Sequence, residues 1–240
     1  MTFAWAAAAG VIAAASFVMG LAGFGIALVA MAFLPYLMST ADAIVLLTIY
    51  AAIFSLVLLI QLRRDVVPRA IVDLLLGSVA GTPLGVWGLA TLPASVLNRL
   101  IGLMLVAAFV LETRGLYPQK LEGRRWGLVA GAFAGVIGGA VGLPGPPVVL
   151  YAATQSWSAR TVKANLQAFF VVNQGAILLG YWWAGLLTRG VWQLTLVFAL
   201  PAIAGAAAGA LMFERVDQRR FRQLVFGLIL LSGLVLLVRG

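Results

Sequence analysis

The sequence lacks cysteine and histidine altogether, and only 10% of its 240 residues carry a charge. Without cysteine the chain has no disulfide framework and no thiol nucleophile, and without histidine it has no imidazole to bind a metal or relay a proton. Most enzyme mechanisms rely on groups such as the thiol or the imidazole, which this chain lacks. We therefore expect no catalytic residue, no metal site and no cofactor, which argues against a membrane enzyme such as an intramembrane protease.

Apolar residues dominate the chain instead, at 63% of its length. Such a composition cannot cover a soluble globule with polar surface. Uncharged runs that can cross the roughly 30 Å hydrocarbon core as helices recur along the whole length. The sequence therefore predicts an all-α polytopic membrane protein, with apolar segments at residues 5–38, 43–61, 70–90, 96–111, 126–154, 164–187, 191–213 and 221–238.

The formal charge of +9 reflects arginine and lysine residues that gather in short loops between these segments. This pattern is typical of membrane orientation and not of nucleic-acid binding. We expect the lipid bilayer as a partner and no nucleic acid. No carboxylate falls near the middle of an apolar segment, so neither a cation site nor a carboxylate proton relay is expected.

A polar linker at residues 112–125 divides the chain into two halves that look alike. Each half holds one long apolar segment followed by three shorter ones, and glycines recur in the same order, with Gly81 opposite Gly205 and Gly85 opposite Gly209. We predict a duplication, with residues 1–115 as the first repeat, 116–125 as a cytoplasmic linker and 126–240 as the second repeat.

The long segment of each half contains a glycine-rich break, GLAGFG at residues 20–25 and GAVGLPGPP at residues 139–147. As one helix, residues 5–38 would reach about 50 Å, far more than the bilayer core requires. We therefore expect a broken helical hairpin in each half. The second arm of the hairpin begins near Gly25 in the first half and near Gly145 in the second half. We expect both tips to lie near the middle of the membrane.

The charges of the loops support these hairpins. If every segment crossed once, lysine and arginine would be shared almost evenly between the two faces. If both long segments return to the side they entered, the loops at Arg63, Arg124, Arg160 and Arg220 share one face, which the positive-inside rule makes cytoplasmic. Each half then crosses the membrane three times. Because three is an odd number, the second repeat starts on the opposite face and is inverted, and both termini lie outside the cytoplasm. Inverted repeats with discontinuous helices are common in secondary transporters.

The two breaks are candidate substrate-binding sites, because irregular backbone at membrane depth must be buried or line a wet cavity. A helix that starts at a break points free N–H groups and its positive dipole end toward it, which suits a small anion. The alternative is that the glycines only allow close helix packing. The candidate residues at the breaks are Gly23, Phe24, Gly25, Gly142, Pro144 and Gly145.

Segment 164–187 is the most polar inside its apolar run, because it carries Asn165, Gln167, Asn173 and Gln174. Amides in hydrocarbon need hydrogen-bond partners. These four either line a passage for the substrate or bond helices together, and both interpretations stay open. We include all four among the candidate substrate-binding residues.

A family resemblance rests on three motifs, GLAGFGIALVAMAFLP, AGVIGGAVGLPGPPVVLY and KANLQAFFVVNQG. Together with the repeat, which covers nearly the whole chain, they resemble the TauE/SafE family of sulfite exporters and related organic-anion permeases. The resemblance implies that glycines of both breaks frame the substrate site, with Asn165 and Gln167 nearby.

We therefore expect a secondary transporter of the bacterial inner membrane that exports sulfite, sulfoacetate or a related sulfonate through a site between the two breaks. An anion leaving an inside-negative cell gains about 2.3 kcal/mol per charge per 100 mV, so no coupling ion is required. Alternating access is expected to rock one half against the other. The alternatives are a permease for another small anion such as a carboxylate, and a non-transporting assembly protein; a homodimer is also left open.

Overall fold

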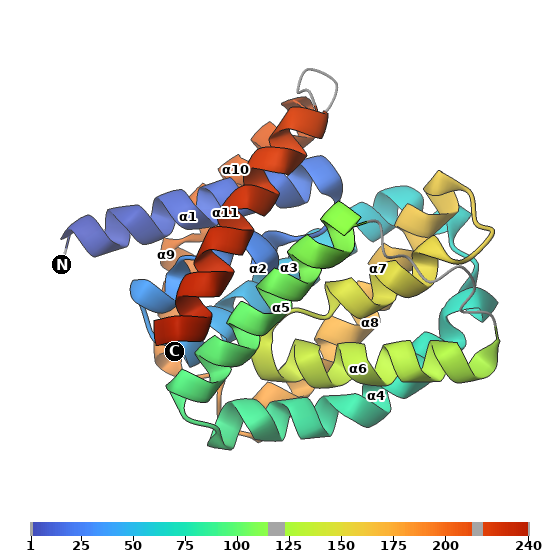
Figure 1. Cartoon of the computed structure of the whole chain (residues 1–240), viewed down its shortest axis with the longest axis horizontal. Coiled ribbons are helices and arrows are strands. Elements are labelled where there is room, and N and C mark those ends of the chain that lie inside the picture. The colour runs from blue at the N-terminus through green and yellow to red at the C-terminus, as the bar shows by residue number, and fades with distance from the viewer. Residues whose placement is uncertain (1, 115–122, 213–217, 240) are drawn as a thin grey trace. The chain divides into compact units, whose positions relative to one another are not determined.

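A computed structural model of the chain describes residues 2–114, 123–212 and 218–239. Every regular element within these ranges is a helix or a 3-10 turn (Figure 1), so the predicted all-α fold is confirmed. Most of the predicted linker, residues 116–122, lies outside the described residues, as does Arg215.

A similar order of helices occurs in both halves, with two 3-10 turns in the first half and a third span divided into two helices in the second. The first half contains α1 (Thr2–Ala22), α2 (Ile26–Ala30), η1 (Leu34–Tyr36), α3 (Thr40–Leu62), η2 (Arg63–Asp65), α4 (Pro68–Thr91) and α5 (Ala94–Arg114). The second contains α6 (Arg124–Val141), α7 (Gly145–Ala153), α8 (Ala159–Trp183), α9 (Arg189–Val197), α10 (Ala199–Met212) and α11 (Gln218–Arg239). The order agrees with a duplication, whereas the inversion of one repeat stays a prediction.

Several helices can cross a membrane by length and composition. In the described ranges these are Ala4–Ala22, Thr40–Asp65, Pro68–Thr91 and Ala94–Leu111, and α9 with α10 makes a further span if the bent pair is counted as one. The predicted apolar segment at 191–213 is therefore a bent pair of helices, with an angle of 48° at the break between α9 and α10. Pro201 explains the bend, because its ring clashes with the carbonyl four residues earlier and its nitrogen donates no hydrogen bond.

The chain divides into two compact units that do not coincide with its halves. Unit 1 comprises residues 1–47, 92–114 and 187–240, and unit 2 comprises residues 48–91 and 115–186. Each unit therefore contains helices from both halves. The predicted repeat boundaries concern a duplication in sequence, which the units do not test, and they stay a prediction.

In unit 2, glycines bring the backbone of α4 directly against that of α6. A Cβ on Gly77 would lie 2.1 Å from the Leu128 carbonyl oxygen, and one on Gly81 would lie 2.3 Å from that of Ala132. In return, a Cβ on Gly131 would lie 2.0 Å from the Leu74 carbonyl oxygen. Only glycine permits such an approach. These glycines form a ladder along each helix, and the ladders let the two backbones pack closely.

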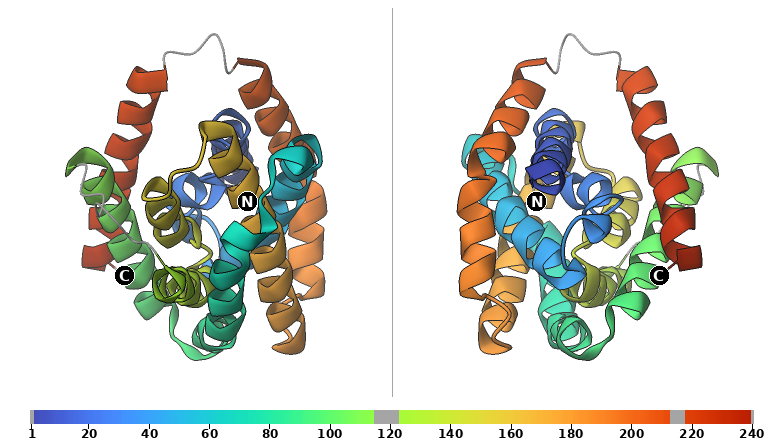
Figure 2. Two further views of the ribbon diagram at one scale, coloured as in Figure 1. Left: turned by 90° about the vertical axis from the view of Figure 1, so that its right-hand side faces the viewer. Right: turned by 90° about the vertical axis from the view of Figure 1, so that its left-hand side faces the viewer.

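Unit 1 repeats this contact with the equivalent helices. A Cβ on Gly205 of α10 would lie 2.1 Å from the carbonyl oxygen of Ala13 in α1, and one on Gly209 would lie 2.1 Å from that of Phe17. Unit 1 also contains α5 beside α11 (Figure 2), where Gly102 and Gly233 meet. In unit 2, α4 of the first half therefore packs on α6 of the second half. In unit 1, the corresponding helix of the second half, α10, packs on α1 of the first half.

Both long segments fold back on themselves, as the predicted hairpins require. In the second half, a Cβ on Gly127 near the start of α6 would lie 3.4 Å from the hydroxyl oxygen of Tyr151 near the end of α7. In the first half, one cavity is lined by Ala4 and Trp5 at the start of the segment and by Leu37 and Met38 at its end. Neither segment is one straight crossing.

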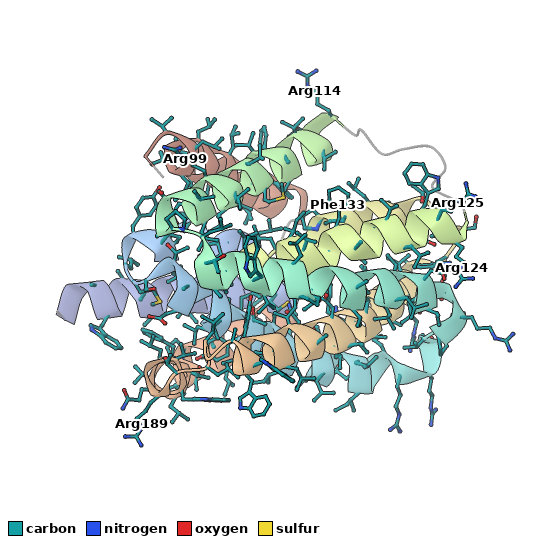
Figure 3. The ribbon with its side chains drawn as sticks, turned by 90° about the horizontal axis from the view of Figure 1, so that it is seen from below. Arg99, Arg114, Arg124, Arg125, Phe133 and Arg189 are labelled. Atoms are coloured by element: carbon teal, nitrogen blue, oxygen red, sulfur yellow. The ribbon has the colours of Figure 1, made fainter. Side chains whose placement is uncertain are left out.

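Ion pairs join three arginine-bearing regions at one end of unit 2. Arg160 Nε lies 2.8 Å from Asp65 Oδ2, and Arg124 Nε lies 3.2 Å from Asp73 Oδ1. Figure 3 shows Arg124 beside Arg125 at the end of α6 far from the break. The η2 turn, the start of α6 and the start of α8 therefore share one end, which a model with every segment crossing once does not allow.

Candidate functional site

The second break is built by Gly142 and the prolines that follow it. Gly142 adopts φ 73°, a left-handed conformation that L side chains rarely adopt, and its N–H donates to the Gly138 carbonyl at 2.9 Å. The chain then starts α7 at Gly145, with Pro146 and Pro147 in its first turn. Proline suits that turn, because the N–H it lacks has no partner inside the helix. The predicted start of the second arm is confirmed.

The tip of this hairpin lies far along the span. The Tyr181 hydroxyl near the end of α8 donates to the Gly139 carbonyl at 2.8 Å, and a Cβ on Gly139 would lie 2.9 Å from the Val86 nitrogen, late in α4. The 18 residues of α6 extend about 27 Å before the chain turns. How deep this tip lies in the membrane stays a prediction.

The break packs against α8 next to the buried amides. A Cβ on Gly138 would meet Ile177 Cδ1 and Pro144 Cβ, each at 3.0 Å, so Pro144 and Ile177 flank the same glycine. Asn173 lies one turn before Ile177 on the same face of α8. Beside the break, nothing lies within 4 Å of the position that a Cβ on Gly145 would take, among the residues that the structure describes.

Asn173 lies near the middle of α8 and is completely buried. The Ser78 hydroxyl, halfway along α4, donates a hydrogen bond to Asn173 Oδ1. Asn173 Nδ2 is left without a hydrogen-bond partner among the described residues. Sequence reasoning did not include Ser78 among the candidate residues, because its partner Asn173 is 95 residues away in the sequence.

Asn165 has a different environment, near the charged end of unit 2. Its Oδ1 accepts a hydrogen bond of 2.8 Å from the Val67 N–H, just before α4 begins. This bond ties the loop after α3 to α8. Asn165 Nδ2 is also buried and without a partner in the described part of the chain. Asn165 therefore joins the loop before α4 to α8 through its Oδ1, and its Nδ2 remains a donor without an acceptor among the described residues.

The two glutamines are buried on another face of α8. Gln167 is 1% exposed and Gln174 is 4% exposed. At about 100° per residue they share one face of the helix, apart from the face that Asn173 presents to α4. Gln174 Oε1 has no hydrogen-bond partner within the described ranges.

The first break belongs to unit 1 and differs from the second. Gly23 and Gly25 adopt φ 82° and 96°, with Phe24 between them, and the Gly23 N–H caps α1 by donating to the Met19 carbonyl at 2.7 Å. The helix that follows, α2, has only 5 residues, against 9 in α7. Its dipole is correspondingly weaker, and α2 carries no buried amide like those of α8.

Unit 2 buries two amide NH₂ groups without an acceptor among the described residues, those of Asn165 and Asn173, and one amide oxygen without a donor there, Gln174 Oε1. A buried amide left unpaired costs about 1–3 kcal/mol, and two such NH₂ groups lie on the face of α8 that meets α4 or its preceding loop. An oxyanion supplies only acceptors, so it complements them. The Asn173 NH₂ group can therefore donate to an anion.

Comparison with known proteins identifies a family over nearly the whole chain. No curated protein and no solved structure matches it. A family model described as "Sulfite exporter TauE/SafE" matches residues 7–236, a range that includes both breaks and the amide-bearing helix α8. Together with the apolar helices described above, this match shows that the chain belongs to the TauE/SafE sulfite exporter family, a family of membrane transport proteins.

Proposed function

We propose that the protein exports a small sulfur-containing anion, such as sulfite, sulfoacetate or a related sulfonate, across the bacterial inner membrane. The observation that carries this proposal is the buried, acceptor-free amide NH₂ of Asn173 near the middle of α8, one turn from the residue that packs on the second break. The family to which the chain belongs supports the class of substrate.

Binding rests on neutral groups in this proposal. Amide N–H groups of α8 and the positive end of α7 replace part of the water around the anion. An anion held by hydrogen bonds and a partial charge alone is released more readily than one paired with a buried arginine, since such an ion pair is stronger. Rapid release is what a transporter requires. A small carboxylate is the second candidate substrate, since its oxygens are acceptors of the same kind.

Gly145→Val tests the break as a binding site. The valine side chain meets no atom within 4 Å at its Cβ, so the protein is expected to fold and insert normally. The added methyl groups occupy the space in front of α7, and we expect flux of radiolabelled sulfite from proteoliposomes to fall at least about tenfold, the equivalent of 1.4 kcal/mol. The melting temperature in detergent is expected to stay within a few degrees of wild type.

Two results would count against the proposal. Unchanged flux in Gly145→Val would make the second break a packing device. Wild-type proteoliposomes that carry neither sulfite nor a sulfonate would exclude the sulfur-anion function, and flux of acetate or another small carboxylate in the same vesicles would then favour the second candidate.

We also propose that the second repeat is inverted relative to the first, with the charged end of unit 2 in the cytoplasm and both termini on the other side. The ion pairs at Asp65 and Asp73 support one shared face for three arginine-bearing regions. Single cysteines at Arg64 and at Ser158 are expected to react with an impermeant maleimide only in inside-out vesicles, and a cysteine at Thr188 only in right-side-out vesicles. Labelling of Arg64→Cys and Ser158→Cys from opposite sides would contradict this topology.

The rigid bodies of a transport cycle are not the two sequence halves. The backbone of α4, from the first half, lies against that of α6, from the second, and α1 lies against α10 in the same way. Rocking one half against the other would separate these contacts. We therefore propose that each of these cross-half helix pairs moves as one body during transport.

A further inference from the structure

The Ser78–Asn173 pair is the most deeply buried side-chain pair with an unsatisfied group. Both residues are 0% exposed, and the Ser78 hydroxyl donates to Asn173 Oδ1. This bond determines which way the carboxamide points. With Oδ1 held by Ser78, the NH₂ group must face away from α4, and it has no acceptor among the described residues.

An alternative orientation would cost less in the absence of a ligand. If the carboxamide were flipped, Nδ2 would donate to the Ser78 oxygen, and the hydroxyl proton could bond to a backbone carbonyl of its own helix, as the Thr82 hydroxyl bonds to the Ser78 carbonyl at 2.8 Å. One more N–H of the carboxamide would then be paired than in the observed orientation. The structure instead keeps a donor open near the middle of α8, where lipid provides no acceptor.

The Ser78 hydroxyl is not needed for helix packing. In the equivalent ladder of unit 1, Gly205 corresponds to Gly81, and three residues before it stands Ala202, which is also 0% exposed. Ala202 packs at the same position of the same kind of glycine contact without a hydroxyl. The chain itself therefore shows that alanine fits this position.

We infer that Ser78 is a positioning residue for the substrate anion, because it holds the Asn173 carboxamide with its NH₂ group toward the passing oxyanion. This inference rests on the proposed function and adds a residue of α4 to the site. Ser78 acts through Asn173 and does not itself bind the anion. Its hydroxyl raises the affinity for the anion.

The test is a mutant cycle on sulfite flux in proteoliposomes. Ser78→Ala is expected to raise KM about fivefold, the effect of losing one hydrogen bond of about 1 kcal/mol, with little change in maximal rate. The melting temperature is expected to fall modestly, because Asn173 Oδ1 loses its donor. Asn173→Leu raises KM more strongly. In the Asn173→Leu background, Ser78→Ala is expected to have no further effect on KM, because the carboxamide on which it acts is gone.

Thr82→Val is the matched control, since it removes a buried hydroxyl one turn away that bonds only to the Ser78 carbonyl in the described contacts. It is expected to leave KM unchanged. If Ser78→Ala fails to fold, Ser78→Cys keeps the volume with a weaker donor and is expected to show the same rise in KM.

The inference is overturned if Ser78→Ala and Ser78→Cys keep the wild-type KM, or if the effects of Ser78→Ala and Asn173→Leu are independent. Wild-type flux in the same vesicles separates this failure from failure of the proposed function. Absence of any sulfur-anion flux in wild type rejects both, whereas normal wild-type flux with an unchanged KM in the serine variants rejects the role of Ser78 alone.

Discussion

Replacing Gly131 by leucine is expected to prevent the folded protein from accumulating in the membrane. Even the Cβ would lie 2.0 Å from the Leu74 carbonyl oxygen, and the atom in the way belongs to the backbone, which cannot change rotamer. The α4 and α6 backbones would have to separate along the whole ladder. The expected cost is about 3 kcal/mol or more, measured as a loss of monodisperse protein and a lower melting temperature in detergent.

Gly10→Leu provides the matched control. Gly10 lies in α1, the helix of the first half that corresponds to α6, and a Cβ there meets no atom within 4 Å. The same substitution is therefore expected to leave yield and melting temperature near those of wild type. A Gly131→Leu protein as stable as Gly10→Leu would show that the close contact between α4 and α6 does not exist in the membrane.

The second large effect concerns the driving force. If export is electrogenic and uncoupled, a potential of 100 mV changes the equilibrium distribution of the anion about fiftyfold per unit charge, because it supplies about 2.3 kcal/mol and 1.4 kcal/mol corresponds to tenfold. In proteoliposomes clamped by potassium and valinomycin, labelled sulfite is expected to accumulate on the positive side. Reversing the potassium gradient is expected to reverse the direction.

The variants sharpen this measurement. Asn173→Leu is expected to slow the approach to equilibrium and to leave the final distribution unchanged, because a binding residue alters the rate of an uncoupled transporter and not its thermodynamic end point. Protein-free liposomes under the same potential set the background leak. A final distribution that follows a proton or sodium gradient instead of the potential would contradict uncoupled export.

Much of the fold follows from the linear sequence. Apolar segments long enough to span a bilayer predict helices because backbone groups in lipid must bond within one element. The glycines of the two breaks predict where the helices end, since Gly25 and Gly142 adopt positive φ in the structure. The loop charges around Arg63 and Arg160 predict that both regions share a face, and the Arg160–Asp65 ion pair agrees.

Other features depend on distances between segments that no local pattern encodes. The bend between α9 and α10 had a local signal in Pro201, but the depth of the second hairpin did not, since it depends on how α6 is aligned against α4 and α8. Ser78 could not be recognised as part of the site from its own neighbours. Its partner Asn173 is 95 residues away in the sequence.

By itself, the sequence determined that the protein is a helical membrane protein, where its helices break, and to which family its motifs are similar. Composition, glycine position and loop charge act locally, so they can be interpreted without knowing which helices touch. Only the tertiary structure decided that α4 pairs with α6 and α1 with α10 across the two halves, and that Ser78 orients the Asn173 amide. Those outcomes depend on backbones that approach within contact distance, and the energy of such contacts belongs to pairs of helices and not to either one.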